Sequence, residues 1–311
     1  MTRMLNLILF ELKKILNNKK AFLFLMVLNI TPIIASIVLL LVYLTCKGLG
    51  LGEIQFTGMK TIIQNLFTGH FTLFAYIAPF FLALIVGDSF STEFGRGYMK
   101  MLLLTPVKRW QVVTAKTISI ITYLLIAVLL GGLILQTDLL VARAVTQPTG
   151  ILPPSLQAKA LDSSLSMVSF SSATQLLILT FVSNLMLIGF FIFLSMFFES
   201  AILMSFSSLG IIMGIQVFYL STTVLSTFFA GFKDGSSLKI LITIFDFLAK
   251  HCCFTRHYTD LFTWKVIQDI LDAKSSLLST NIATSLGYCF LWSVIFYGIA
   301  TFVFSRKQVL H

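Results

Sequence analysis

The sequence contains few charged residues. Of its 311 residues only 12 are acidic and 22 are basic, so charged side chains make up 11% of the chain, whereas a soluble globular domain has about a quarter. Hydrophobic residues make up 57%, and the mean hydropathy is +0.95. This composition excludes an ordinary water-soluble domain, a disordered chain and a nucleic-acid-binding module. It predicts an integral membrane protein.

Several motifs that carry chemistry are also missing. The chain has no G-x-x-x-x-G-K-[ST] loop to hold nucleotide phosphates, no H-E-x-x-H and no G-x-S-x-G. The cluster of His251, Cys252, Cys253 and His257 lacks the two-residue gap between cysteines that zinc sites usually have, so we predict no metal site there. We therefore expect a chain that is not an enzyme and that holds no catalytic residue and no cofactor of its own.

Six apolar stretches are long enough to cross a membrane, which takes roughly 20 helical residues. The segments between them that fall on the same side as the two termini are richer in Lys and Arg than those on the other side, which predicts cytoplasmic termini and explains most of the net charge of +10. No nucleic-acid partner is needed to account for that charge, although attraction to anionic lipid fits it. The predicted spans are residues 21–46, 66–87, 112–135, 173–198, 201–225 and 282–304.

Two further segments are predicted to lie at the membrane surface. Residues 1–20 carry apolar side chains at helical spacing and are expected to form an interfacial amphipathic helix. The outer segment 231–280 mixes amphipathic stretches with charges, and its part 238–254 contains Lys239, Asp246 and Lys250. Those three charges oppose full insertion, so we expect an interfacial or re-entrant helix before the last span. The whole chain, 1–311, then forms one all-α transmembrane domain.

The segment 88–116 is the only predicted cytoplasmic segment long enough to have structure of its own. Glu93, Arg96 and Lys100 follow one another at spacings of three and four, which places them on neighbouring positions of a helix. An apolar patch follows at 101–104, and Pro106 ends that helix before the next span. This pattern favours a docking helix for a soluble protein, and a basic loop that only sets orientation is the simpler alternative.

These residues resemble the ABC type-2 permeases, the transmembrane subunits of ATP-binding-cassette transporters. The resemblance includes the amphipathic N-terminal helix, the six spans, the short turn at Glu199 and Ser200 and the basic tail. It departs at Tyr98, where the family often has a small hydroxyl residue after the glycine. The resemblance implies that 88–116 couples the chain to an ATPase through Glu93, Arg96, Gly97, Lys100, Leu102, Leu103, Leu104, Pro106 and Arg109.

The resemblance also implies partners and a location. A separate cytosolic ATPase subunit would bind ATP and magnesium, and a second permease, identical or paralogous, would complete the transporter. We expect a multi-pass protein of the cytoplasmic (inner) membrane of a bacterium that exports a hydrophobic or amphipathic substrate. The 31 phenylalanine residues would suit the walls of a transport pathway for such a substrate.

Two other functions remain open at this stage. A membrane scaffold could recruit a cytosolic partner through the same segment without transporting anything. An ion-coupled carrier would normally keep ionisable residues at mid-membrane depth, and the centres of the six predicted spans contain no Asp, Glu, Lys or Arg. The carrier is therefore the less favoured alternative.

Small residues at a spacing of four mark places where helices can approach closely. Gly210 and Gly214 form such a pair in the fifth span, and Ala283 and Gly287 form another in the sixth. The pairs could serve packing within the chain or a dimer interface. The sequence does not choose between the two.

Overall fold

The structure, a computed structural model, describes residues 2–48, 55–95, 108–146, 170–230, 243–244, 247, 254–272 and 276–306. All regular elements within these ranges are helices, which confirms the all-α prediction for them. In chain order the helices are α1 (Thr2–Leu16), α2 (Lys19–Gly48), α3 (Gln55–Ser89), α4 (Ser91–Gly95), α6 (Arg109–Thr146), α8 (Phe170–Ser195), α9 (Ala201–Ala230), α11 (Phe254–Leu261), α12 (Trp264–Leu271) and α13 (Thr280–Arg306).

Each apolar stretch predicted from the sequence falls on a helix, because a long apolar segment can satisfy its backbone polar groups in lipid only as a helix. Among the described residues, five helical segments are long and apolar enough to cross a membrane. They are Phe67–Gly95, Arg109–Thr137, Phe170–Ser195, Ala201–Ser221 and Thr280–Arg306. The remaining predicted span, 21–46, lies within the 30 residues of α2.

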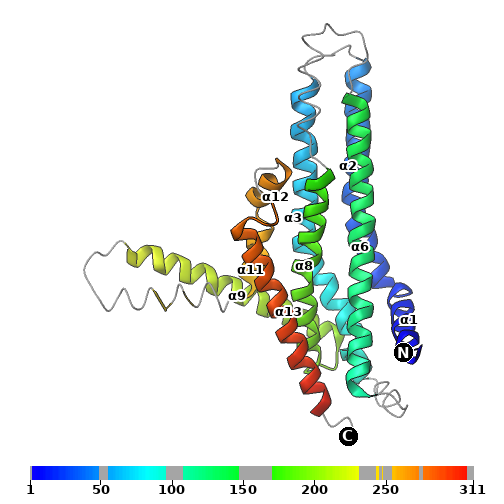
Figure 1. Cartoon of the computed structure of the whole chain (residues 1–311), viewed down its shortest axis with the longest axis vertical. Coiled ribbons are helices and arrows are strands. Elements are labelled where there is room, and N and C mark those ends of the chain that lie inside the picture. The colour runs from blue at the N-terminus through cyan, green and yellow to red at the C-terminus, as the bar shows by residue number, and fades with distance from the viewer. Residues whose placement is uncertain are drawn as a thin grey trace.

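Helix α8 lies at the centre of the bundle, packed against α3, α6 and α13. Figure 1 shows α2, α3 and α6 running along the long axis of the molecule, with α9 leaning away from the others. Helices α8 and α13 cross closely, since a Cβ added at Gly189 would lie 2.9 Å from the carbonyl oxygen of Ser293. The Ser293 hydroxyl donates a hydrogen bond to the Leu185 carbonyl at 3.0 Å, which fixes the same crossing.

Helix α1 and the C-terminal end of α13 lie at the same end of the bundle, which we call the termini end. The Ser119 hydroxyl of α6 donates to the carbonyl of Ile8 in α1 at 2.9 Å. Near the start of α6, Arg109 donates from Nη1 to the carbonyl of Ser305 in α13 at 3.2 Å. The start of α6 therefore contacts both α1 and the end of α13, as Figure 1 shows.

Helix α1 is the amphipathic helix that the sequence predicts, but part of its apolar side is exposed and one of its carboxylates is buried. Leu5, Leu9 and Phe10 are exposed by 57%, 54% and 62%, whereas Glu11 and Ile15 are buried. The chain thus presents an apolar surface outward, where an interfacial helix would meet lipid. The inward face of α1 carries a carboxylate.

Two short helices, α11 and α12, lie before α13 within the segment 231–280. Ile267 and Ile270 of α12 are fully buried, and the hydroxyl of Tyr258 in α11 donates to the carbonyl of Ala75 in α3 at 3.0 Å. Burial raises the pKa of Tyr258 well above its usual range, and the nearby Cys289 thiol adds to this shift. Most of the predicted interfacial helix 238–254 lies outside the described residues.

Candidate functional site

A buried group of charged side chains joins three elements at the termini end. The Lys116 ammonium lies 2.7 Å from Glu11 Oε1 and 2.8 Å from Glu93 Oε2. Lys14 forms an ion pair with the other oxygen of Glu93. We call Glu11, Lys14, Glu93 and Lys116 the charge cluster. It connects α1, which carries Glu11 and Lys14, to α4 and to α6.

The charge cluster is largely removed from solvent. Lys116 has no exposed surface, Glu11 is 3% exposed and Glu93 is 7% exposed. The side chain of Lys14 is half exposed, and the Lys116 ammonium also lies 5.9 Å from the centre of the Phe90 ring. Two positive and two negative charges balance, which is the condition for keeping charges away from water. Loss of Lys116 would leave Glu11 buried without a counter-charge, whereas Glu93 would keep Lys14.

A second, more exposed ion pair lies beside the cluster. Lys20 of α2 lies 2.8 Å from Asp88 Oδ1 at the end of α3, and the Asn18 amide donates to Asp88 Oδ2 at 3.0 Å. The Asn18 side-chain oxygen also accepts the backbone N–H of Lys20 at 3.0 Å, as an N-cap residue of α2 does. Asp88 therefore ties the end of α3 to the beginning of α2.

Helix α4 sits against the short turn between α8 and α9. The Ser91 hydroxyl donates to the carbonyl of Ser195 at 3.3 Å. A Cβ added at Gly95 would lie 2.6 Å from the carbonyl oxygen of Glu199, and one at Gly87 would lie 2.9 Å from the Cα of Ala201. Only glycine leaves room for these two contacts. The start of the segment 88–116 is thus held between the charge cluster on one side and this turn on the other.

A cleft of about 430 Å³ opens beside α4 at the same end. Its lining combines the charged side chains of Lys20, Asp88 and Glu199 with the backbone of Gly95 and with Ile202, which is 60% exposed. A surface that is charged at its edge and has an apolar side chain is suited to bind a protein.

Of the predicted coupling residues, the structure describes two. Glu93 points inward to Lys116 and Lys14, and Arg109 is held by the carbonyl of Ser305. Both contacts are with the chain itself. The remaining predicted residues lie outside the described residues: Arg96, Gly97, Lys100, Leu102, Leu103, Leu104 and Pro106.

The predicted small-residue pairs lie on open surface. Among the residues that the structure describes, a Cβ added at Gly210, Gly214 or Gly287 would meet nothing within 4 Å, and Ala283 is exposed. Close packing within the described part of the chain instead uses Gly87, Gly95 and Gly189. No described part of the chain covers the G-x-x-x-G face of α9, which can meet another helix or lipid.

Sequence reasoning missed the charge cluster. The sequence predicts an interfacial helix over 1–20 and a coupling segment over 88–116, but no contact between Glu11 or Lys14 and Lys116. The available signal was the position of Lys116, five residues into an apolar run, where a cation needs a partner. Of the cluster of His251, Cys252, Cys253 and His257, only His257 lies within the described residues. Its ring stacks on Tyr288 with 4.3 Å between ring centres.

Comparison with known protein families decides what kind of membrane protein this is. The family described as ABC-2 family transporter protein matches residues 5–309, nearly the whole chain. The chain belongs to this family. No curated protein matches the sequence. As an ABC-2 transporter protein, the chain is a multi-pass membrane permease of an ABC transporter, the transmembrane component rather than the ATPase. Permeases of this family normally work with an ABC ATPase subunit.

Proposed function

We propose that this ABC-2 permease crosses the cytoplasmic membrane of a bacterium six times, with both termini in the cytoplasm, and exports a hydrophobic or amphipathic substrate. In this topology α2 is the first span and the termini end faces the cytoplasm. The basic residues Lys13, Lys14, Lys19 and Lys20 at that end support this orientation. A separate ATPase subunit binds ATP and magnesium and supplies the energy.

The segment 88–116 is the proposed contact with the ATPase. The observation that carries this proposal is the Glu93–Lys116 ion pair, because it joins the beginning of the segment to its end. A segment whose two ends are joined by an ion pair moves as one unit. When the ATPase moves the segment, α6 moves through Lys116 and α1 moves through Glu11 and Lys14.

Residues 96–106 of this segment are the proposed direct contacts, with Arg96 and Lys100 as charged groups and Leu102, Leu103 and Leu104 as the apolar ones. Glu93 then acts indirectly, as the residue that anchors this part to the bundle. The charged cleft beside α4 adjoins the same contact and would widen the surface available to the ATPase.

A second permease copy or a paralogue completes the transporter in this proposal. The open G-x-x-x-G face of α9, with Gly210 and Gly214, supports a helix–helix contact there because small residues let backbones approach closely in lipid. Ala283 and Gly287 on α13 offer a second such surface.

Affinity purification of the tagged protein in mild detergent tests the proposal. We expect the wild type to recover an ABC ATPase, identified by mass spectrometry, and ATP hydrolysis in the eluate. Arg96→Glu with Lys100→Glu should remove the ATPase, whereas Lys265→Glu, an exposed charge change on α12, should not. If the wild type recovers no ATPase while other membrane complexes survive, a scaffold without transport is the better description.

A further inference from the structure

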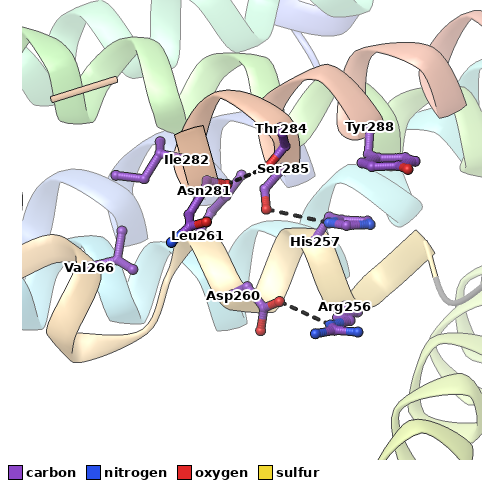
Figure 2. Close-up of a pocket in the computed structure, with 10 residues that line it drawn as sticks. All are labelled: Arg256, His257, Asp260, Leu261, Val266, Asn281, Ile282, Thr284, Ser285 and Tyr288. Atoms are coloured by element: carbon purple, nitrogen blue, oxygen red, sulfur yellow. Dashed lines mark hydrogen bonds and ion pairs between the residues drawn. The ribbon is translucent and has the colours of Figure 1, made fainter. Parts of the chain in front are cut away.

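A pocket lies between α11 and the beginning of α13, at the opposite end of α13 from Arg306. Its volume is about 430 Å³, within the range of small-molecule sites. Figure 2 shows that side chains from both helices enter it. The residues that line it are Arg256, His257, Asp260, Leu261, Val266, Asn281, Ile282, Thr284, Ser285 and Tyr288.

The floor of the pocket is apolar, and its other groups are polar or charged. Leu261 and Ile282 are 2% and 5% exposed and Val266 lies beside them, so the pocket does not continue into a polar interior. Asn281 and Thr284 are exposed, and each can offer hydrogen-bonding groups to a ligand. The combination suits a molecule with a polar end.

One edge of the pocket carries both signs of charge. The Arg256 Nε lies 3.3 Å from Asp260 Oδ2, and the two side chains are 22% and 45% exposed. This contact uses one of the five N–H donors of the guanidinium and one carboxylate oxygen. The guanidinium carbon also lies 5.1 Å from the centre of the Tyr219 ring in α9. A cation and an anion so close together can bind the opposite charges of a zwitterion.

Another edge is formed by two aromatic rings. His257 and Tyr288 stack with ring planes 5° apart, and His257 Nδ1 lies 3.4 Å from the Ser285 hydroxyl. These contacts fix the position of both rings.

An apolar stripe runs along α13 from the edge of the pocket. Starting from Tyr288, residues at helical spacing on the same face are Leu291, Ile295 and Ile299, which are 51%, 37% and 42% exposed. The neighbouring α9 also exposes Phe218 and Leu220 on either side of Tyr219. A ligand whose polar end occupies the pocket could lay hydrocarbon chains on this stripe.

We propose that the pocket between α11 and α13 binds a phospholipid with a zwitterionic headgroup. Arg256 holds the phosphate, Asp260 holds the ammonium group, and the stripe along α13 carries the acyl chains. The pocket lies near the end of a membrane-spanning helix, which is the depth of lipid headgroups. This site needs only that the chain lies in a membrane and is independent of the proposed ATPase coupling.

The test compares lipids on the purified full-length protein. The protein is washed free of lipid in detergent and incubated with phosphatidylethanolamine, with phosphatidylglycerol or with the water-soluble glycerophosphoethanolamine. Retained ligand is counted by native mass spectrometry, and the shift in unfolding temperature is measured in parallel. We expect phosphatidylethanolamine to be retained at least about tenfold better than phosphatidylglycerol and to raise the unfolding temperature. Glycerophosphoethanolamine should do neither at the same concentration.

Variants locate the binding. Arg256→Gln with Asp260→Asn removes both charges but keeps hydrogen-bonding groups, and it should abolish the preference for phosphatidylethanolamine. Lys265→Gln changes an exposed charge outside the pocket and should preserve it. Ser285→Leu, which fills the pocket without touching the charges, should lower retention if the double variant does not fold.

Three results would overturn the proposal. The first is equal retention of phosphatidylglycerol, which would mean that the ammonium group is not recognised. The second is binding of glycerophosphoethanolamine as tight as that of the lipid, which would make the ligand a soluble phosphodiester. The third is a lipid preference that the double variant and Ser285→Leu leave unchanged.

Discussion

The ammonium group of Lys116 bridges Glu11 and Glu93, two carboxylates that lie far apart in the sequence and on different helices, at 2.7 and 2.8 Å. Removing the lysine from such a buried group costs more stability than the intact group contributes. The reason is that Glu11 would remain buried with neither a counter-charge nor water.

We therefore predict that Lys116→Met strongly destabilises the protein, by about 3–5 kcal/mol. Adding Glu11→Gln should recover part of the loss, since Glu11 is the carboxylate left without a cation, whereas Glu93 keeps Lys14. Unfolding temperature in detergent measures the effect, with Lys13→Met, an exposed lysine of α1, as the control. Equal effects of Lys116→Met and Lys13→Met would contradict the buried arrangement.

The Lys20–Asp88 pair should behave differently because its side chains are 42% and 21% exposed. Solvent screens such pairs, and we expect Lys20→Ala to cost less than about 1 kcal/mol. The cost should fall further as salt is raised, whereas that of Lys116→Met should hardly change. A salt titration of the unfolding temperature of both variants separates the two cases, and parallel salt dependence would count against this difference.

Glycine substitutions should separate packing within the chain from contacts made outside it. Gly189→Ala places a Cβ 2.9 Å from the Ser293 carbonyl and should destabilise the α8–α13 crossing by about 1–3 kcal/mol. Gly210→Ala meets no atom of the described residues within 4 Å, and alanine is the better helix former, so it should not lower the unfolding temperature of the detergent-solubilised monomer. The prediction fails if the two variants unfold at the same temperature.

Larger substitutions on α9 test the proposed dimer contact. Gly210→Leu with Gly214→Leu keeps the helix apolar but prevents close approach, so it should lower the dimer fraction several-fold in cross-linking or mass photometry. Gly298→Leu on α13, which also faces open space, is the matched control. A dimer that resists the α9 change but is lost with the control would move the interface to α13.

The Tyr258 hydroxyl should stabilise the protein in a pH-dependent way. It donates to the Ala75 carbonyl, so Tyr258→Phe should cost about 1 kcal/mol at neutral pH. Burial raises the pKa of Tyr258 in the folded protein above the usual tyrosine value near 10, so folding favours the protonated phenol. That contribution is complete below pH 10 and declines as the pH rises above it. Wild type and variant should therefore converge in stability at high pH, and a constant difference would argue against a buried phenol.

Much of the helical architecture follows from the sequence, because a bilayer accepts few alternatives to an apolar helix. The predicted stretch 173–198 and the observed α8 differ by only a few residues at each end. The charge cluster could not be predicted in the same way. Periodicity shows that Glu11 and Lys14 lie off the apolar side of α1, but it does not show that α6 offers a buried cation to that side. The role of the small-residue pairs could not be predicted for the same reason. A spacing of four suits contact with a helix of the same chain and contact with a second protein equally well.

Helix α6 is uninterrupted over 38 residues, which makes it about 57 Å long at 1.5 Å per residue. Glu11, Glu93 and the end of α13 hold its beginning, so a rigid-body tilt of α6 would pivot at the termini end. A tilt of about 5° there moves its other end by about 5 Å at that length. A small displacement of the anchored segment would thus be amplified across the membrane without any change inside the helix.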